Sequence, residues 1–461
     1  MSKAINQEEI IKEIASAIHD LGGRALLVGG CVRDQLLGIP CYDIDCEVHG
    51  VAPDALRALL ERFGEIDGSG EKYGIFTIRG AGIDVALPRK EARTGPGHKD
   101  FAVRVDPMLP PEIAAARRDF TINAVMRDAL TGEYVDPFGG IEDLKKGVLR
   151  AVPGGQFEED PLRVLRGAQF AARFHLAPDA ETMGKMQRMP VHTLSAARVM
   201  DETKKALLKS DRPSIYFRVL EKADALDPWF KELAALRSIP QNPVYHPEGD
   251  ALAHTLMVLD EAAAIRDKMD DPLSFMLAGL CHDLGKATAM QVREDGRIQA
   301  IGHEHTGVPL IGNMLTRLSV NKHTIAYVKN MCKLHMRVHT CYYGKARVSR
   351  TNVLFDEAMN AEELAWLVVC DSRGTGKPRK KADIEQAFIM ERLALYREEA
   401  AGPMPDARML MAAGCAPGPG LKSAIAKARE LVLGGETIEK AVSRAIALSG
   451  PAGQLSLKGE L

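Results

Sequence analysis

The chain has 461 residues, of which 46% are hydrophobic and 26% are charged. This length exceeds one compact core, so we expect two to four domains, and the composition excludes a collagen, a long coiled coil and a largely disordered chain. The 60 basic and 62 acidic residues leave a net charge of −2, so a nucleic-acid partner must be bound by a locally basic surface. The eight cysteines form no CxxC pair, and neither a signal peptide nor an apolar run of 18 residues occurs, which predicts a cytoplasmic protein without a membrane partner.

The first part of the chain predicts a small domain of mixed strands and helices. Apolar residues recur at helical spacing over residues 7–21, and Gly22-Gly23 ends that helix. Further elements alternate as strand, helix, strand, helix, strand and strand, over residues 25–28, 32–37, 43–48, 53–63, 74–79 and 83–87. Residues 89–99 are rich in Gly, Arg and Lys without apolar periodicity, so we expect a mobile basic loop there.

From about residue 119 the pattern becomes mostly helical, and a Pro/Gly-rich segment at residues 238–249 predicts the main domain boundary. Eight of the 13 histidines lie between residues 246 and 339. We therefore expect an α+β chain of five regions. They are an N-terminal helix (1–22), a head with a mixed sheet (23–140), an all-α neck and body (141–238), a histidine-rich helical domain (239–375) and a helical tail (376–461).

Two glycines and three aspartates form the first candidate site. Gly29 and Gly30 follow a strand and open a helix, where unpaired backbone N–H groups bind phosphate oxygens. Asp43 and Asp45 are two residues apart on the next strand, so their carboxylates share one face and suit two Mg²⁺ ions that bridge a nucleoside triphosphate. Asp84, on a further strand, can complete the carboxylate set. Each feature alone also fits a plain turn or a solvated acidic pair, and their conjunction favours the nucleotide site.

The sequence RRDFTINA supplies a second set of polar residues at the start of a helix. Asp119 is a candidate helix cap, and Asn123 lies one turn further on the same helix face. Arg117 and Arg118 sit at the same end and can grip a triphosphate while Asp119 or Asn123 binds a ribose hydroxyl. A capped helix with solvated arginines is the alternative.

The sequence EDPLRVLR predicts a helix that begins at Pro161 with Asp160 as its cap. A carboxylate accepts from the exocyclic amine of cytosine or adenine, and a guanidinium donates to the neighbouring ring nitrogen or carbonyl. Asp160 and Arg163 can therefore select C and A over U and G, with Arg166 close by. The alternative is a capped helix with salt bridges.

The motif GGxVRDxLLGxxxxDxD resembles the head motif of the class II tRNA nucleotidyltransferase and poly(A) polymerase family, within the DNA polymerase β superfamily. The resemblance implies a polymerase-β-like head in which Asp43 and Asp45 are the catalytic Mg²⁺ ligands, and Asp84 stands where the family often has glutamate. It also implies that RRDFTINA surrounds the sugar and phosphates, that EDPLR selects the base, and that residues 89–100 form a flexible loop that helps to switch from CTP to ATP. The implied nucleotide-binding residues are Gly29, Gly30, Arg33, Arg117, Arg118, Asp119, Asn123, Asp160, Arg163 and Arg166.

A histidine–aspartate set follows in separate helical runs: His254, His282, Asp283 and Asp371. Imidazole and carboxylate ligands together suit Ni²⁺, Mn²⁺ or Mg²⁺, which activate water. The pattern H…HD…D resembles the HD phosphohydrolase superfamily, with His303 and His335 as further contacts to a second metal or a phosphate. The other histidines of this region are assigned to the surface or the core: His246, His305, His323 and His339.

A nucleotidyltransferase head followed by an HD domain resembles the longer bacterial CCA-adding enzymes, whose HD domain has 2′,3′-cyclic phosphodiesterase, 2′-nucleotidase and phosphatase activity. We therefore predict a monomeric or homodimeric transferase that adds C, C and A to tRNA from CTP and ATP. It would use Mg²⁺ in the head and Ni²⁺ or another divalent transition metal in the HD domain.

Three alternatives remain open. A CC-only or A-only enzyme is the nearest. A poly(A) polymerase is less favoured, because GSGEKYGIFTIRG lacks the paired basic residues which that enzyme carries after DxD. An HD hydrolase whose head only binds RNA is the alternative from another class.

Overall fold

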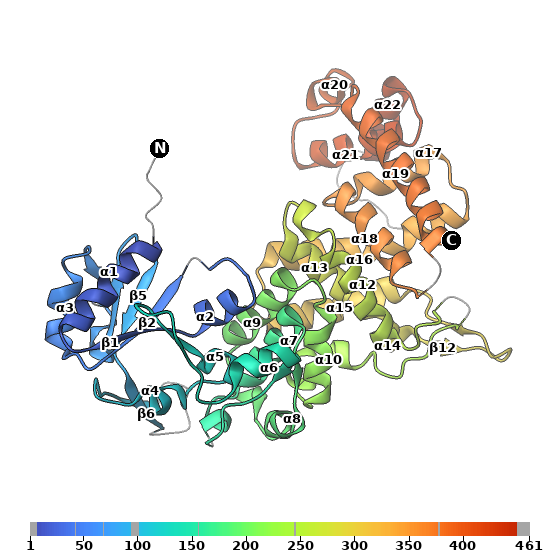
Figure 1. The fold of residues 1–461 in the computed structure, drawn as a ribbon. Helices are drawn as coiled ribbons and strands as arrows, with labels where there is room; N and C mark the ends of the chain where they lie inside the picture. The colour runs from blue at the N-terminus through green and yellow to red at the C-terminus, as the bar shows by residue number, and fades with distance from the viewer. Residues whose placement is uncertain are drawn as a thin grey trace. The chain divides into compact units, whose positions relative to one another are not determined.

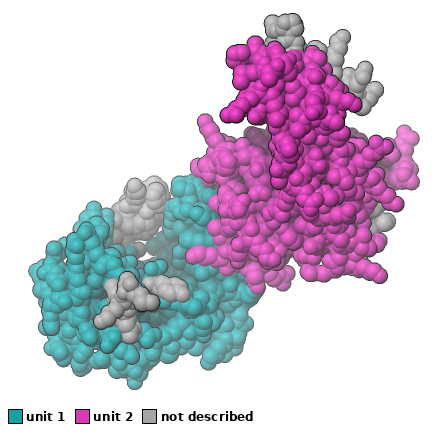
Figure 2. All heavy atoms as spheres, turned by 90° about the horizontal axis from the view of Figure 1, so that it is seen from above, with its two compact units in different colours: residues 1–206, 218–225 teal, residues 207–217, 226–461 magenta. Residues whose placement is uncertain are grey.

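The computed structural model describes residues 7–41, 43–67, 69–93, 101–154, 156–243, 246–376 and 379–449. The chain divides into two compact units (Figure 2), one of residues 1–206 and 218–225 and the other of residues 207–217 and 226–461. Within the described ranges, no helix is long and apolar enough to cross a membrane. The predicted α+β class is confirmed, with a mixed sheet at the N-terminal end and helices through the rest of the chain.

The first unit is built on a seven-stranded mixed sheet with the strand order β3-β4-β5-β2-β1-β8-β9. β2 and β5 pair in parallel, and the other neighbouring strands pair antiparallel. The strands are β1 (Arg24–Val28), β2 (Ile44–His49), β3 (Ile66–Asp67), β4 (Ile75–Ile78), β5 (Ile83–Ala86), β8 (Met126–Asp128) and β9 (Tyr134–Val135).

Alternation along these strands separates a buried face from a polar one. The helices α1 (Gln7–Asp20) and α3 (Pro53–Leu60) lie beside each other in Figure 1, and their apolar side chains share one core with Cys46, Val48 and Val85 of the sheet. Because successive strand residues point to opposite faces, Asp45 and Glu47 of β2 lie on the other face. The sheet thus presents its carboxylates away from the α1–α3 core.

The remaining elements of the first unit are mostly short helices. They are α2 (Gly30–Leu36), α4 (Pro111–Ala115), α5 (Thr121–Ala124), α6 (Gly140–Lys146), α7 (Leu162–Phe174), α8 (Ala180–Gln187) and α9 (Ala196–Lys209), with the strand pair β10 (Val148–Leu149) and β11 (Ala177–Pro178). The predicted helices and strands of the head are present, with ends that differ by at most three residues.

The prediction of a mobile basic loop at residues 89–99 is wrong for the first half of that segment. Residues 89–93 form β6 (Arg89–Arg93), which pairs antiparallel with β7 (Phe101–Val105), and residues 94–100 lie outside the described ranges. Main-chain ladder hydrogen bonds hold β6 although its sequence RKEAR has no apolar periodicity, so that segment gave no signal for a strand.

The second unit is helical. Four of its helices, α12 (Ala251–Ala263), α13 (Pro272–Cys281), α16 (Lys322–Tyr343) and α18 (Ala361–Arg373), pack against one another (Figure 1). The others are α10 (Ser214–Lys222), which begins in this unit and ends in the first, α11 (Asp227–Ala234), α14 (Lys286–Ala289), α15 (His303–Arg317), α17 (Val348–Asp356), α19 (Arg379–Ala401), α20 (Ala407–Ala412), α21 (Pro419–Leu433) and α22 (Ile438–Ser449), with the hairpin β12 (Gln291–Val292) and β13 (Ile298–Gln299).

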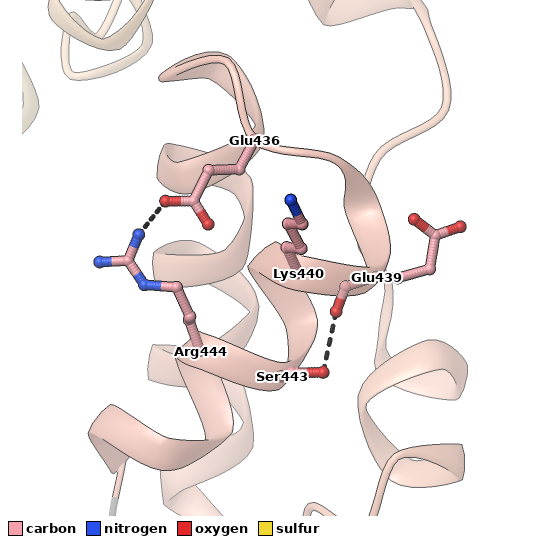
Figure 3. A pocket seen from close by; sticks show the side chains of 5 residues that line it. All are labelled: Glu436, Glu439, Lys440, Ser443 and Arg444. Carbon is pink, nitrogen blue, oxygen red and sulfur yellow. Dashed lines mark hydrogen bonds and ion pairs between the residues drawn. The ribbon is translucent and has the colours of Figure 1, made fainter.

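The C-terminal helices carry a shallow hollow along α22, shown in Figure 3. Arg444 pairs with Glu436, and the Ser443 hydroxyl donates to the Glu439 carbonyl at 2.9 Å. These local interactions belong to the helix and the turn before it, and none of the predicted site residues lines the hollow.

Candidate active sites

The three predicted aspartates of the head lie together at one end of the sheet. The parallel register of β2 and β5 places Asp45 directly opposite Asp84, while Asp43 immediately precedes β2. Partial burial, together with repulsion from Asp84 and Asp43, raises the pKa of Asp45, and Arg118 opposes this rise. Carboxylates that repel one another in this way are stabilised by a shared cation, and an all-oxygen set suits Mg²⁺.

The turn at Gly29 lies between the Arg118 guanidinium and these carboxylates. Gly29 has a φ of 72°, which favours glycine, and a Cβ there would lie 3.1 Å from Nη1 of Arg118 and 3.7 Å from Oδ2 of Asp45. A side chain at this position would therefore fill the space between the arginine and the aspartate. The turn, the guanidinium and the carboxylate enclose a place where a phosphate can meet both a cation and the metal ligands.

Glu47 is a site residue that sequence reasoning missed. It is buried on β2, with Arg117 Nη2 at 3.0 Å, Arg118 Nη2 at 4.0 Å and His49 Nε2 at 3.3 Å from its carboxylate. Burial opposes its ionisation, but His49 and the two arginines outweigh this effect and lower the pKa of Glu47 to about 2. Its spacing of two residues from Asp45 was the signal that could have found it.

Four of the predicted nucleotide-binding residues form one hydrogen-bonded chain. Arg33 donates to Asn123 Oδ1 at 2.7 Å, Asn123 donates to Asp119 Oδ1 at 2.8 Å, and Arg166 Nε donates to Asp119 Oδ2 at 2.7 Å. Burial opposes ionisation of Asp119, yet Arg166 and Asn123 together lower its pKa. The expected cap is displaced by one residue, because Phe120 takes the cap position of the four-residue α5 while Asp119 accepts from the Phe120 amide at 2.8 Å.

Arg33 and Asn123 are buried inside this chain. The Arg33 guanidinium also bonds to Asp34 and lies 4.4 Å from the ring centre of Phe174. In this structure Arg33 therefore contributes to the head site by orienting the Asn123 side chain.

The proposed base-reading pair lies at the start of α7, which begins one residue later than expected. Pro161 takes the cap position, and Asp160 Oδ1 accepts from the Leu162 amide at 3.0 Å. Arg163 donates to the main-chain carbonyls of Gln156 at 2.6 Å and Arg117 at 2.9 Å. These bonds hold the guanidinium beside the RRD segment.

Arg198 of α9, which sequence reasoning did not single out, binds Asp160. Its Nη2 lies 2.8 Å from Asp160 Oδ2 and 3.1 Å from Oδ1. The two residues are 38 positions apart in the chain, and no local pattern relates them.

In the second unit, three buried histidines share one local arrangement. Nδ1 of His282, His303 and His335 faces the carbonyl three residues earlier, at 2.9, 2.7 and 2.6 Å. A carbonyl can only accept a hydrogen bond, so Nδ1 carries a proton, and in the neutral imidazole Nε2 then carries a lone pair. All three Nε2 atoms are thereby prepared as ligands.

These lone pairs converge on Asp283. Nε2 of His282 lies 3.2 Å from Asp283 Oδ2, and Nε2 of His303 and His335 lie 3.0 and 3.9 Å from Oδ1. His282 Nε2 and Asp283 Oδ2 are buried and make no hydrogen bond, although Lys286 Nζ lies 2.6 Å from that oxygen outside hydrogen-bond geometry. Lone pairs that face carboxylates fit a divalent cation between them.

His254 and Asp371 complete the set on the other side. Nε2 of His254 lies 3.0 Å from Asp371 Oδ1 and 3.5 Å from Asp283 Oδ2. Burial disfavours the charged imidazole, but hydrogen bonds to Asp371 and Glu248 outweigh it and raise the pKa of His254 to about 9. The field at this nitrogen therefore favours positive charge, as a metal site requires. All four predicted HD residues, with His303 and His335, lie in one buried cluster.

His246 and His339, which the sequence left among the surface or core histidines, contact residues of this cluster. Nε2 of His339 lies 2.9 Å from Asp371 Oδ2, and Nδ1 of His246 lies 2.9 Å from Glu248, which also bonds to His254. Helix packing brings His339 to Asp371, 32 positions away, and the sequence did not reveal this contact, whereas His246 and Glu248 are only two residues apart. Glu385, which bonds to His339, was missed because it reaches the cluster from another helix, and Glu248 was missed although it lies only six residues before His254.

Comparisons with known proteins agree with this arrangement. Residues 25–150 match the family described as the poly A polymerase head domain, residues 174–236 match the probable RNA and SrmB-binding site of polymerase A, and residues 251–365 match the HD domain.

Solved structures share the fold. An apo CCA-adding enzyme has a TM-score of 0.66 at 18% identity, with 96% of this chain and 95% of that chain covered. The Bacillus stearothermophilus CCA-adding enzyme in complex with CTP has a TM-score of 0.62 at 20% identity, with 95% and 98% covered. The Thermotoga maritima CCA-adding enzyme complexed with tRNA has a TM-score of 0.61 at 18% identity, with 97% and 96% covered.

Curated relatives are similar over most of the chain. The multifunctional CCA protein of Mannheimia succiniciproducens is 36% identical over 362 residues, which cover 76% of this chain and 83% of the relative. That of Stenotrophomonas maltophilia is 36% identical over 416 residues, which cover 87% and 97%. With this identity over nearly the whole relative, and with the head and HD residues assembled as described, the chain belongs to the multifunctional CCA protein family.

Proposed function

We propose that this protein adds C, C and A to the 3′ end of tRNA, using CTP and ATP without a nucleic-acid template. The observation that carries the proposal is the grouping of Asp43, Asp45 and Asp84 beside Gly29 and Arg118. Membership of the multifunctional CCA protein family supports it.

In this mechanism Asp43 and Asp45, with Asp84, would hold Mg²⁺. When bound, the metal polarises the α-phosphate and favours ionisation of the attacking 3′-hydroxyl. Arg118, beside the Gly29 turn, binds the triphosphate, and Glu47 holds Arg117 in place. Asp160 and Arg163 read the base, so the nucleotide is chosen by protein side chains.

The experiment incubates the protein with tRNA that lacks CCA and with each labelled nucleotide. We expect CTP and ATP to be incorporated and UTP and GTP to be rejected. Asp43→Ala or Asp45→Ala should abolish both additions, because losing a metal ligand costs several kcal/mol of transition-state stabilisation. The exposed Asp54→Ala, in the first turn of α3, is the matched control.

Each alternative has its own result. Incorporation of CTP alone or ATP alone would identify a CC-only or A-only enzyme, and long A tails would identify a poly(A) polymerase. If no nucleotide is incorporated, the remaining alternative is an HD hydrolase whose head only binds RNA.

The HD cluster supports a second function, a metal-dependent phosphohydrolase acting on 2′,3′-cyclic and 2′-phosphates. His254, His282, Asp283 and Asp371 would hold Ni²⁺ or another divalent transition metal. When bound, the metal activates a water as nucleophile. Because Asp283 directs one oxygen toward His282 and the other toward His303, His303 and His335 offer contacts to a second ion or to the phosphate. Hydrolysis of 2′,3′-cyclic AMP by the metal-stripped protein, before and after addition of Ni²⁺, Mn²⁺ or Mg²⁺, tests this function.

A further inference from the structure

Two buried glutamates contact the outer nitrogens of histidines in the HD cluster. Nδ1 of His254 lies 2.9 Å from Glu248 Oε1, and Nδ1 of His339 lies 2.7 Å from Glu385 Oε1. The other nitrogen of each ring, Nε2, contacts a different carboxylate oxygen of Asp371, at 3.0 Å for His254 and 2.9 Å for His339. The result is a continuous chain, Glu248–His254–Asp371–His339–Glu385.

These two histidines differ from the others in how they are oriented. His282, His303 and His335 each bond to a carbonyl three residues earlier, so their own segments hold them. Nδ1 of His254 faces Glu248 at 2.9 Å and the Gly374 carbonyl at 3.2 Å, and Nδ1 of His339 faces Glu385. Glutamate side chains therefore orient these two rings, as main-chain carbonyls orient the other three.

Both glutamate side chains are buried, and each makes a second hydrogen bond. The Glu248 side chain is only 2% exposed, and it also accepts from His246 at 2.9 Å. Glu385 is 5% exposed, and its second oxygen accepts from the Ser372 hydroxyl at 2.6 Å. Glu385 lies on α19, beyond residue 375, where the sequence suggested that the HD domain ends. Both lie outside the segment that matches the HD family.

We propose that Glu248 and Glu385 are positioning residues of the HD metal site, Glu248 by orienting His254 and Glu385 by orienting His339 against Asp371. This inference rests on the proposed metal-dependent function of the HD cluster. A carboxylate that accepts from the outer N–H of a ligating histidine, as Glu248 does for His254, fixes its tautomer and ring orientation. A ligating carboxylate such as Asp371 is likewise oriented by its hydrogen-bond partner, here His339, which Glu385 holds. Losing such a partner typically costs 10- to 100-fold in metal affinity.

The test measures binding of Ni²⁺ alone by calorimetry, with metal-stripped protein that carries no histidine tag. The double variant His282→Ala, Asp283→Ala serves as the blank, so that binding elsewhere, including the head, is subtracted. Glu248→Ala and Glu385→Ala should each weaken the remaining Ni²⁺ binding by about 10- to 100-fold. Glu248→Gln and Glu385→Gln keep an acceptor oxygen and should stay within about threefold of the unchanged protein.

Glu304→Gln is the matched control. Glu304 lies 3.8 Å from Nδ1 of His303, but that nitrogen bonds to the Ala300 carbonyl instead. Its variant should bind Ni²⁺ normally. The melting temperature of each metal-free variant and its incorporation of CTP into tRNA verify that the chain is intact.

The outcomes separate this inference from the function on which it rests. If the unchanged protein binds no more Ni²⁺ than the blank, the HD metal site itself is wrong. If it binds Ni²⁺ and both alanine variants bind equally well, only the positioning role is overturned. Should Glu248→Ala fail to fold, the Glu385→Ala and Glu385→Gln pair decides the question, because Glu385 reaches the site from a different helix.

Discussion

We propose both a structural and a base-selecting role for Arg163 in the head. Its guanidinium donates to two main-chain carbonyls, and it lies one helical turn from Asp160. A correctly placed pair of this kind is worth about 1–3 kcal/mol of discrimination between bases.

We expect Arg163→Ala to reduce the preference for CTP and ATP over UTP and GTP by about 10- to 100-fold, because the donor to the base edge is lost. Competition between nucleotides on tRNA that lacks CCA measures this change. Arg188→Ala is the control, since Arg188 forms an exposed pair with Glu158. Unchanged selectivity in a stable Arg163→Ala protein would assign Arg163 to helix packing alone.

The lowered pKa of Glu47 predicts that the stability of the folded protein depends on pH. Its pKa is lowered from 4.5 to about 2, so folding favours the charged carboxylate. A depressed pKa contributes stability that is complete above the unfolded pKa, near 4.5, and is lost as pH falls toward 2. The full contribution is about 3 kcal/mol.

The unchanged protein should therefore exceed Glu47→Gln in unfolding free energy most clearly at pH 6, and the difference should shrink steadily between pH 4.5 and 3. Urea unfolding followed by circular dichroism at each pH measures this. The exposed Glu65→Gln should show no such trend. A difference that stays constant with pH would show that Glu47 acts only through its shape.

The HD site also depends on how closely two helices approach each other. Gly285, at the start of α14, packs against α15, and a Cβ there would clash with the His303 carbonyl and the Gly307 amide. These are main-chain atoms, so the clash can be relieved only if the helices separate. His303 would move with α15.

Gly285→Ala should destabilise the second unit by at least about 2 kcal/mol, as overpacked sites do. Both tryptophans of the chain, Trp229 and Trp366, lie in this unit, so their fluorescence during urea unfolding reports its stability. Gly420→Ala is the control, because nothing lies within 4 Å of a Cβ at that position. Equal stability of the two variants would contradict the close approach of α14 and α15.

The two candidate sites belong to different units and share no residue. Sites without a common ligand should fail independently. We therefore expect His282→Ala with Asp283→Ala to remove hydrolysis of 2′,3′-cyclic nucleotides and to leave CCA addition nearly intact. Asp43→Ala should do the reverse.

Both assays on both variants, before and after chelation and metal addition, measure this independence. Chelation followed by Ni²⁺ or Mn²⁺ should restore hydrolysis, since imidazole ligands favour these ions over Mg²⁺. Loss of nucleotide addition in a folded HD variant would show instead that the two units are coupled.

The sequence by itself determined the local geometry of this protein. The spacing of apolar residues gave the helices and strands of the head, and the i,i+2 spacing of Asp43 and Asp45 and the i,i+4 spacing of Asp119 and Asn123 gave shared faces, because backbone geometry fixes such neighbours. The strand β6 left no such signal, because its sequence RKEAR lacks apolar periodicity and main-chain pairing with β7 holds it.

Only the tertiary structure decided which distant residues meet. His254 reaches Asp371 across 117 positions and His339 reaches Glu385 across 46, and these contacts depend on helix packing. Glu47, Glu248 and Glu385 look like ordinary surface glutamates in the sequence, since a side chain's burial and its charged partners are set by the elements packed around it. The sequence thus identified the candidate site residues, and helix packing determined which other residues contact them.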